Sequence, residues 1–185
     1  MAAKAWVLTA VGQDRPGIVA RVTKLLFEFG CNLEDSAMTR LGGEFAIMLL
    51  FSSPPKLPRA KLEKACQAVG KQLKLTLQVK ALKGSGARGA ARGAVHLISV
   101  YGGDRPGIVY RVSQLLADLK VNISDLSTHR TVPPKGRKTA PLYLMLLEVE
   151  LPARVTPEQL DARLRRLAKG LGCEVSLRSA EADVL

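Results

Sequence analysis

Nearly the same ten residues occur twice in this chain, 90 positions apart. The first copy, QDRPGIVARV, begins at Gln13, and the second, GDRPGIVYRV, begins at Gly103. A repeat of this kind constrains the fold strongly, because a fixed period marks a structural unit that occurs more than once. A chain of 185 residues has room for two units of that length. The sequence therefore predicts two similar small domains.

The segment between the two copies cannot contribute to a core. Residues 83–93, KGSGARGAARG, contain four glycines, one serine and no large apolar side chain. This composition is typical of a flexible linker. We therefore expect one domain over residues 1–82, a flexible basic linker over 83–93 and a second domain over 94–185.

Each half begins with a short apolar run and then an apolar stripe. The runs at residues 5–11 and 95–101 are rich in β-branched residues and predict strands. The stripes that follow have the spacing of one helix face. Their members are Ile18, Val19, Val22, Leu25, Leu26 and Phe29 in the first half and Ile108, Val109, Val112, Leu115, Leu116 and Leu119 in the second. Gly30 is placed to end the first of these helices.

The remaining patterns also occur in the same order in both halves. Two strands, a second helix and a final strand are predicted over residues 31–82, and again over residues 121–179. The apolar stripes of the second helices are Leu62, Ala65, Cys66, Val69 and Leu73, and Leu160, Leu164, Leu167 and Leu171. The order βαββαβ, found twice, predicts an α+β protein of two ferredoxin-like modules. Each module is a four-stranded antiparallel sheet with two helices on one face.

The two halves differ most between their second and third strands. The first half has LGGE at residues 41–44, which predicts a tight glycine hairpin. The second half has TVPPKGRKTAP at residues 131–141, a longer basic loop. This loop is either a solvated connection or a segment that docks a partner.

The formal net charge of +12 is concentrated in the first half and the linker. Residues 1–82 carry 12 basic and 6 acidic residues, 83–93 carry three basic and none acidic, and 94–185 carry 13 and 10. Such an excess is either a solvated basic surface or an attraction to acidic partners or nucleic acid. Aromatic residues make up only 4% of the chain, so few base-stacking positions are available. Direct nucleic-acid binding is therefore a weaker alternative.

Other features argue against membrane, metal and enzyme classes. No apolar run reaches the roughly 18 residues needed to cross a bilayer, and the N-terminus lacks a signal-peptide pattern; we expect a cytoplasmic protein. Cys31, Cys66 and Cys173 have no metal-ligand spacing, so we expect reduced structural thiols without a metal or other cofactor. His96 and His129 have no matching nucleophile, and catalysis is not expected.

The repeated DRPG loop predicts a ligand site at a helix start. Asp14 or Arg15 is expected near the N-cap, Pro16 in the first helical turn, and Gly17 where a side chain would keep a ligand from the backbone. Unpaired N–H groups at a helix start attract anions such as a carboxylate.

An amino-acid ligand also needs an acceptor for its ammonium group. Asp14 supplies a carboxylate, and Asn32, which begins the next strand, could contact the same molecule. The alternative is purely structural, since Asp before a helix can be a cap and Asn can complete a turn. Asp104 and Asn122 repeat both residues in the second half, which favours the ligand site.

These residues resemble the ACT domain, a small-molecule-sensing module, and the whole chain resembles the tandem-ACT glycine cleavage system transcriptional repressor family. The matching segments are VLTAVGQDRPGIVARVTKLL, GCNLEDSAMTRLGGEFAIMLLF, GGDRPGIVYRV and VNISDLS. The resemblance implies that amino acids bind at interfaces between ACT units. The residues it selects here are Gly12, Gln13, Asp14, Gly17, Ile18, Asn32, Gly102, Gly103, Asp104, Gly107, Ile108 and Asn122.

The resemblance also implies a non-enzymatic regulator. It predicts a homodimer that senses glycine and controls transcription through a partner transcription factor. A regulatory subunit of an amino-acid-metabolising enzyme remains an alternative, because it would use the same sensing chemistry with a different partner.

Overall fold

The computed structural model describes residues 3–82, 94–131 and 141–180. The chain divides into two compact units, residues 1–89 and 90–185. We call the described residues of these units the first module (3–82) and the second module (94–131 and 141–180). The predicted linker, 83–93, and most of the basic loop, 132–140, lie outside the described residues.

Each module has the element order that the sequence predicts. The first contains β1 (Lys4–Gln13), α1 (Ile18–Glu28), β2 (Asn32–Leu41), β3 (Glu44–Ser53), α2 (Arg59–Leu73) and β4 (Leu75–Ala81). The second contains β5 (Val95–Gly103), α3 (Ile108–Asp118), β6 (Asn122–Arg130), β7 (Leu142–Glu150), α4 (Pro157–Leu171) and β8 (Cys173–Ser179). The sheets have the antiparallel orders β2-β3-β1-β4 and β6-β7-β5-β8. Two ferredoxin-like βαββαβ modules are therefore confirmed.

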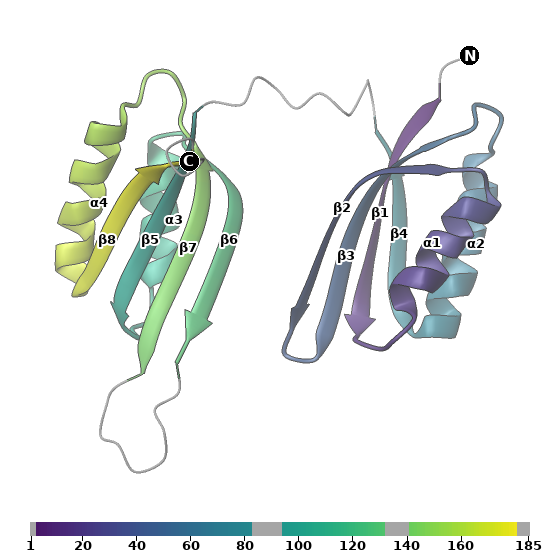
Figure 1. The fold of residues 1–185 in the computed structure, drawn as a ribbon, viewed down its shortest axis with the longest axis horizontal. Coiled ribbons are helices and arrows are strands. Elements are labelled where there is room, and N and C mark those ends of the chain that lie inside the picture. The colour runs from purple at the N-terminus through teal and green to yellow at the C-terminus, as the bar shows by residue number, and fades with distance from the viewer. Residues whose placement is uncertain (1–2, 83–93, 132–140, 181–185) are drawn as a thin grey trace, which may run out of the picture. The chain divides into compact units, whose positions relative to one another are not determined.

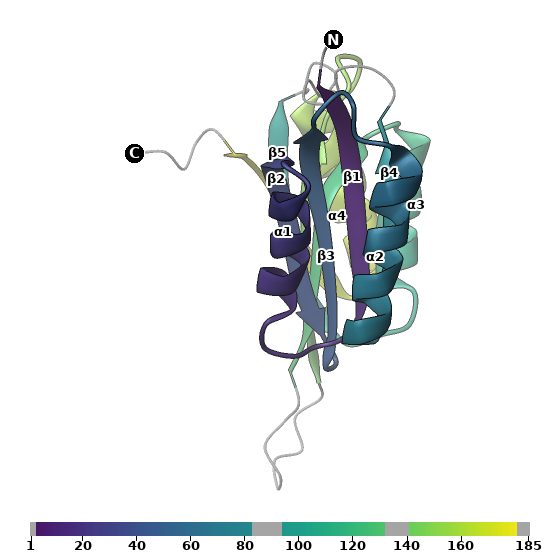
Figure 2. The same ribbon diagram turned by 90° about the vertical axis from the view of Figure 1, so that its right-hand side faces the viewer.

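Both helices of each module lie on the same side of its sheet (Figure 1). In the first module α1 and α2 run side by side across the sheet (Figure 2). Because strand side chains alternate between faces, every second residue of β1 points beneath the helices. Trp6, Leu8 and Ala10 are buried there, and the indole N–H of Trp6 donates to the buried Ser53 hydroxyl at 2.9 Å. The core is therefore a single layer between sheet and helices.

The helix stripes pack into these cores with one exception. Ile18, Val22 and Leu26 are buried in α1, and Ile108, Val112 and Leu116 are buried at the equivalent positions of α3. Val19, which the stripe includes, is instead 42% exposed. It lies at the margin of the helix face, so its position on the helix does not carry it into the core.

Glycines shape the first module where the backbone requires a positive φ. Gly42 and Gly43 have φ values of 60° and 86° and form the predicted hairpin between β2 and β3. Gly30 follows α1 at φ 65°, as expected of a residue that ends a helix. In the second module Lys120 takes that conformation at φ 58°, so a non-glycine residue ends α3 there.

Candidate functional site

The loop between β1 and α1 differs in detail from the prediction. The helix begins at Ile18, with Gly17 as its N-cap at φ 90° and ψ −5°. Pro16 therefore lies in the turn before the helix and not in its first turn, and neither Asp14 nor Arg15 caps it. Gly17 has the dihedral angles of the third residue of a type II turn, where proline commonly precedes glycine. Gly107 repeats this conformation at φ 92° and ψ 1°.

The starts of α1 and α3 are open. No side chain caps either helix, and a Cβ atom added at Gly17 or Gly107 would meet nothing within 4 Å. The first N–H groups of a helix have no partner within the helix, so these two starts offer donors to an anion. In contrast, Thr156 and Gln159 form a capping box at the start of α4. The start of α2 also lacks a side-chain cap, so openness alone does not distinguish α1 and α3.

An ion pair beside each loop does distinguish them. The Asp14 carboxylate lies 3.0 Å from the Arg40 guanidinium, and the Asp104 carboxylate lies 2.7 Å from that of Arg130. Both arginines lie near the ends of the second strands, β2 and β6. All four side chains remain partly exposed, so each pair presents both signs of charge to solvent.

Sequence reasoning missed these two arginines, although a signal for them exists. Arg40 and Arg130 are 90 positions apart, which is also the separation of Asp14 and Asp104. A search for every polar residue repeated at this period would have included them.

Some predicted site residues have structural roles that the sequence did not reveal. Gly12 and Gly102 lie within β1 and β5 and not in the loops. A Cβ atom at Gly12 would be 2.7 Å from the Leu75 side chain, and one at Gly102 would be 2.8 Å from Cys173 Sγ. These glycines allow close packing against the start of the last strand. Ile18 and its counterpart Ile108 are buried, so only their backbones could face a ligand.

The residues at the ends of β1 and β5 differ between the modules. Arg15 donates to the Gln13 side chain at 2.9 Å in the first module. Gly103 replaces Gln13 in the second, and a Cβ atom there would meet nothing within 4 Å. Arg105 instead donates to the Leu171 carbonyl at 3.4 Å, near the end of α4. The two equivalent arginines therefore bond to different partners.

The asparagines lie far from the loops of their own modules. Asn32 pairs with Ser52 of β3, whereas Gly12, next to the loop, pairs with Phe45 of the same strand. The seven residue steps between those two partners on β3 correspond to about 23 Å. Asn122 has the same placement and donates to Glu150 at 3.3 Å. The expectation that one module brings Asp and Asn onto one ligand is therefore wrong.

The histidines and cysteines take structural positions. His96 is buried in β5, with its Nδ1 3.0 Å from the Ala94 carbonyl oxygen, and His129 contacts Ser127 on β6. All three cysteines are free thiols. Within the described ranges, no group of three His, Cys, Asp or Glu residues is arranged to hold a metal ion, and no helix is long and apolar enough to cross a membrane.

Family models match both modules. One ACT domain model matches residues 4–80, and a second matches residues 96–168. The two matches together cover most of the chain. The first runs from β1 into β4, and the second runs from β5 into α4 and stops before β8.

Similar proteins include one that matches nearly the whole chain and one that matches less than half of it. The glycine cleavage system transcriptional repressor of Escherichia coli K12 is 28% identical over 176 residues, which is 92% of this chain and 87% of the repressor. A UPF0237 protein of Streptococcus mutans is 35% identical over 74 residues, or 40% of this chain and 84% of that protein.

Solved structures share the fold. A protein of Galdieria sulphuraria described as unknown has a TM-score of 0.82 at 24% identity, covering 97% of this chain and 99% of its own. A candidate glycine cleavage system transcriptional repressor has a TM-score of 0.68 at 24% identity, covering 96% and 98%. At this identity the likeness establishes the fold alone.

Proposed function

Because the chain belongs to the ACT-domain family and carries two ACT domains in tandem, we propose that it is a non-enzymatic, glycine-responsive transcriptional regulator. Similarity to a transcriptional repressor over nearly the whole chain supports a regulatory, amino-acid-sensing role. We further propose that glycine is the ligand, that a partner transcription factor conveys the response, and that the protein acts in the cytoplasm.

The observation that carries the proposal is the ion pair beside each open helix start. In a glycine complex the ligand carboxylate would accept from the N–H groups of α1 and from Arg40, while its ammonium group would lie against Asp14. The pair thus supplies both contacts that a zwitterion needs. Asp104 and Arg130 would act in the same way in the second module.

The asparagines enter this proposal differently from the loop residues. Asn32 lies at the opposite end of its own sheet, so it can contribute only to a ligand held at the loop of another ACT unit. The same holds for Asn122. This arrangement agrees with the interface binding that the family resemblance implies.

The size of glycine limits its affinity. Five non-hydrogen atoms, at a ceiling of about −1.5 kcal/mol each, give at best about −7.5 kcal/mol, which corresponds to micromolar or weaker binding. Binding in this range responds to a metabolite that is present at micromolar to millimolar concentrations.

Isothermal titration calorimetry tests the site, with glycine compared against the other amino acids. Asp14→Asn and Asp104→Asn together should weaken binding at least tenfold, as should Arg40→Gln with Arg130→Gln. Glu28→Gln is the matched control, because it removes an exposed carboxylate from the far end of α1. Equal binding by all these variants would contradict the proposed site. Asn32→Ala with Asn122→Ala tests whether a second unit contributes.

A pull-down distinguishes the alternatives for the partner. Recovery of a transcription factor, strengthened or weakened by glycine, is the expected result. Recovery of a metabolic enzyme alone would favour a regulatory subunit. Retention of a DNA duplex by the purified chain at physiological salt would favour direct nucleic-acid binding.

A further inference from the structure

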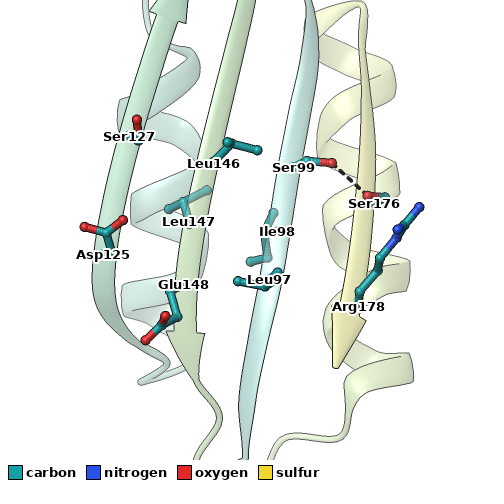
Figure 3. A pocket seen from close by; sticks show the side chains of 10 residues that line it. All are labelled: Leu97, Ile98, Ser99, Asp125, Ser127, Leu146, Leu147, Glu148, Ser176 and Arg178. Carbon is teal, nitrogen blue, oxygen red and sulfur yellow. Dashed lines mark hydrogen bonds between the residues drawn. The ribbon is translucent and has the colours of Figure 1, made fainter. Parts of the chain in front are cut away.

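The sheet of the second module has an open face opposite α3 and α4. Leu97, Tyr101 and Leu146 point to this face and are between 40% and 46% exposed. A hollow of about 520 Å³ lies over the middle of the sheet, with Leu97 and Leu146 on its floor (Figure 3). Grouped exposed apolar side chains of this kind indicate a surface that another molecule covers.

The strand register arranges the open face in rows that cross the four strands. In the order β6, β7, β5, β8, the rows are Asp125–Glu148–Leu97–Arg178, Ser127–Leu146–Ser99–Ser176 and His129–Leu144–Tyr101–Glu174. The central strands therefore carry most of the apolar side chains, and the edge strands carry polar ones.

Opposite charges occupy the two edges. Asp125 lies on the β6 edge and Arg178 on the β8 edge of the first row (Figure 3). Glu148 adds a second carboxylate directly beside Asp125, although like charges in facing positions of a sheet repel each other. Among the described residues, Arg178 and these two carboxylates form no ion pair. Glu148 accepts a hydrogen bond from the Ser124 hydroxyl at 2.7 Å, whereas Asp125 and Arg178 at the two edges remain available to a partner.

The first module repeats this polarity with different residues. The equivalent row is Asp35–Leu50–Val7–Lys80, again with a carboxylate at one edge and a cation at the other. The two modules therefore have the same arrangement of charges, although the cation is Lys80 in the first and Arg178 in the second.

We propose that the open face of the second module binds the same face of a second copy of this chain. A two-fold axis between the sheets and parallel to the strands places the β8 edge of one copy over the β6 edge of the other. Arg178 then faces Asp125 in the first row, and Glu174 faces His129 in the third. Each contact occurs twice, as a two-fold interface requires.

The size and composition of the face suit such an interface. Four strands of about nine residues cover about 19 Å by 30 Å, so two copies would bury about 1,100 Å² together, above the roughly 1,000 Å² of a specific interface. Leu97, Leu144 and Leu146 would form its apolar centre. The charged residues on the edge strands would form a polar rim, as in other protein interfaces.

A small amino acid does not fit this face as well as a second copy does. Asp125 and Arg178 are three strand spacings apart, about 14 Å, whereas the two charges of an α-amino acid are attached to one carbon atom. The charged first row, which the test below alters, is also separate from the loop residues proposed to bind glycine, because Leu97 and Asp125 lie seven and five residues before Asp104 and Arg130 on their strands. Dimer formation and ligand binding can therefore be measured, and can fail, independently.

Charge reversal in the full-length chain tests the proposal by sedimentation velocity. Arg178→Glu should weaken dimerisation at least tenfold, as should the double variant Asp125→Lys, Glu148→Lys. An equimolar mixture of these two variants should dimerise like the wild type, because each variant then faces opposite charges at both edges. Lys80→Glu is the matched control in the first module and should leave the dimer intact.

Several results would overturn the proposal. The wild-type chain should be tested at up to 100 times the concentrations used for the variants. If it remains monomeric there, a second copy does not cover this face. In such a monomer, a cysteine introduced by Leu146→Cys could still be protected from a thiol reagent. Another part of the same chain would then cover the open face. Equal weakening by Lys80→Glu and Arg178→Glu, or failure of the mixture to restore dimers, would also contradict the proposed face.

Discussion

Two neighbouring glycines in β5 should respond in opposite ways to the same substitution. Both Gly102 and Gly103 are predicted ligand-site residues. They correspond to Gly12 and Gln13 of the first module. A methyl group at Gly102 would lie 2.8 Å from Cys173 Sγ, 3.0 Å from Cys173 Cα and 3.1 Å from the Gly172 carbonyl oxygen. A methyl group at Gly103 would meet nothing within 4 Å.

The expected free-energy changes follow from these contacts. Because two of the three atoms near Gly102 belong to backbone, the strand must shift, and overpacking of this kind costs about 1–3 kcal/mol. For a domain of this size each 1 kcal/mol lowers Tm by about 4–8 °C. Gly103→Ala creates no clash and restricts the unfolded chain, so it should leave stability unchanged or raise it by up to about 1 kcal/mol.

The aromatic residues allow each module to be followed separately. The only tryptophan, Trp6, is in the first module, and all three tyrosines, Tyr101, Tyr110 and Tyr143, are in the second. Urea unfolding followed by tyrosine emission should show the loss for Gly102→Ala, while tryptophan emission reports the first module. Adding Cys173→Ala should recover only part of the loss, because the backbone contacts remain. An unchanged tyrosine transition for Gly102→Ala would refute the close-packing role.

Two further predictions concern the buried polar and thiol groups of the first module. Ser53→Ala removes the acceptor of the buried Trp6 indole N–H, so it should lower the free energy of unfolding by about 1–3 kcal/mol. Urea unfolding followed by tryptophan fluorescence measures this loss. Ser52 is half-buried on the other face of the sheet, so Ser52→Ala is the control and should have a smaller effect. Burial, with smaller contributions from Cys31 and Glu63, raises the pKa of the Cys66 thiol from 9.0 to about 11. The folded state therefore holds this proton more tightly, so its stabilising effect is complete below pH 9 and is lost as pH rises through 11. The wild type should lose about 2–3 kcal/mol more than Cys66→Ala between pH 9 and 11, and equal losses would contradict this prediction.

The fold was predictable because local patterns and topology agree. Strand alternation, helix stripes such as that from Ile18 to Phe29, and the hairpin glycines Gly42 and Gly43 all specify the same βαββαβ unit. The repeat tests each assignment twice. Val19 differs because a stripe in the sequence does not show where the edge of the packed face falls.

The site was only partly predictable, and the reason lies in strand direction. β1 and β2 are both antiparallel to β3, so they run in the same direction and their ends meet at the same edge of the sheet. The residue near the β1 loop is therefore Arg40, at the end of β2, and not Asn32, at its start. The predicted βαββαβ topology already implies this placement, whereas residue type alone does not show at which end of the sheet a side chain lies. The close contact between Gly102 and Cys173 depends on atomic packing, which no sequence pattern shows.

The two loops differ in what holds them. In the first module Arg15 bonds to Gln13, two residues away on the adjoining strand. In the second, Arg105 reaches the last carbonyl of α4, 66 residues later in the chain. A displacement of Arg105 would therefore break a contact with the last turn of α4, whereas the bond between Arg15 and Gln13 lies within the first loop and its adjoining strand.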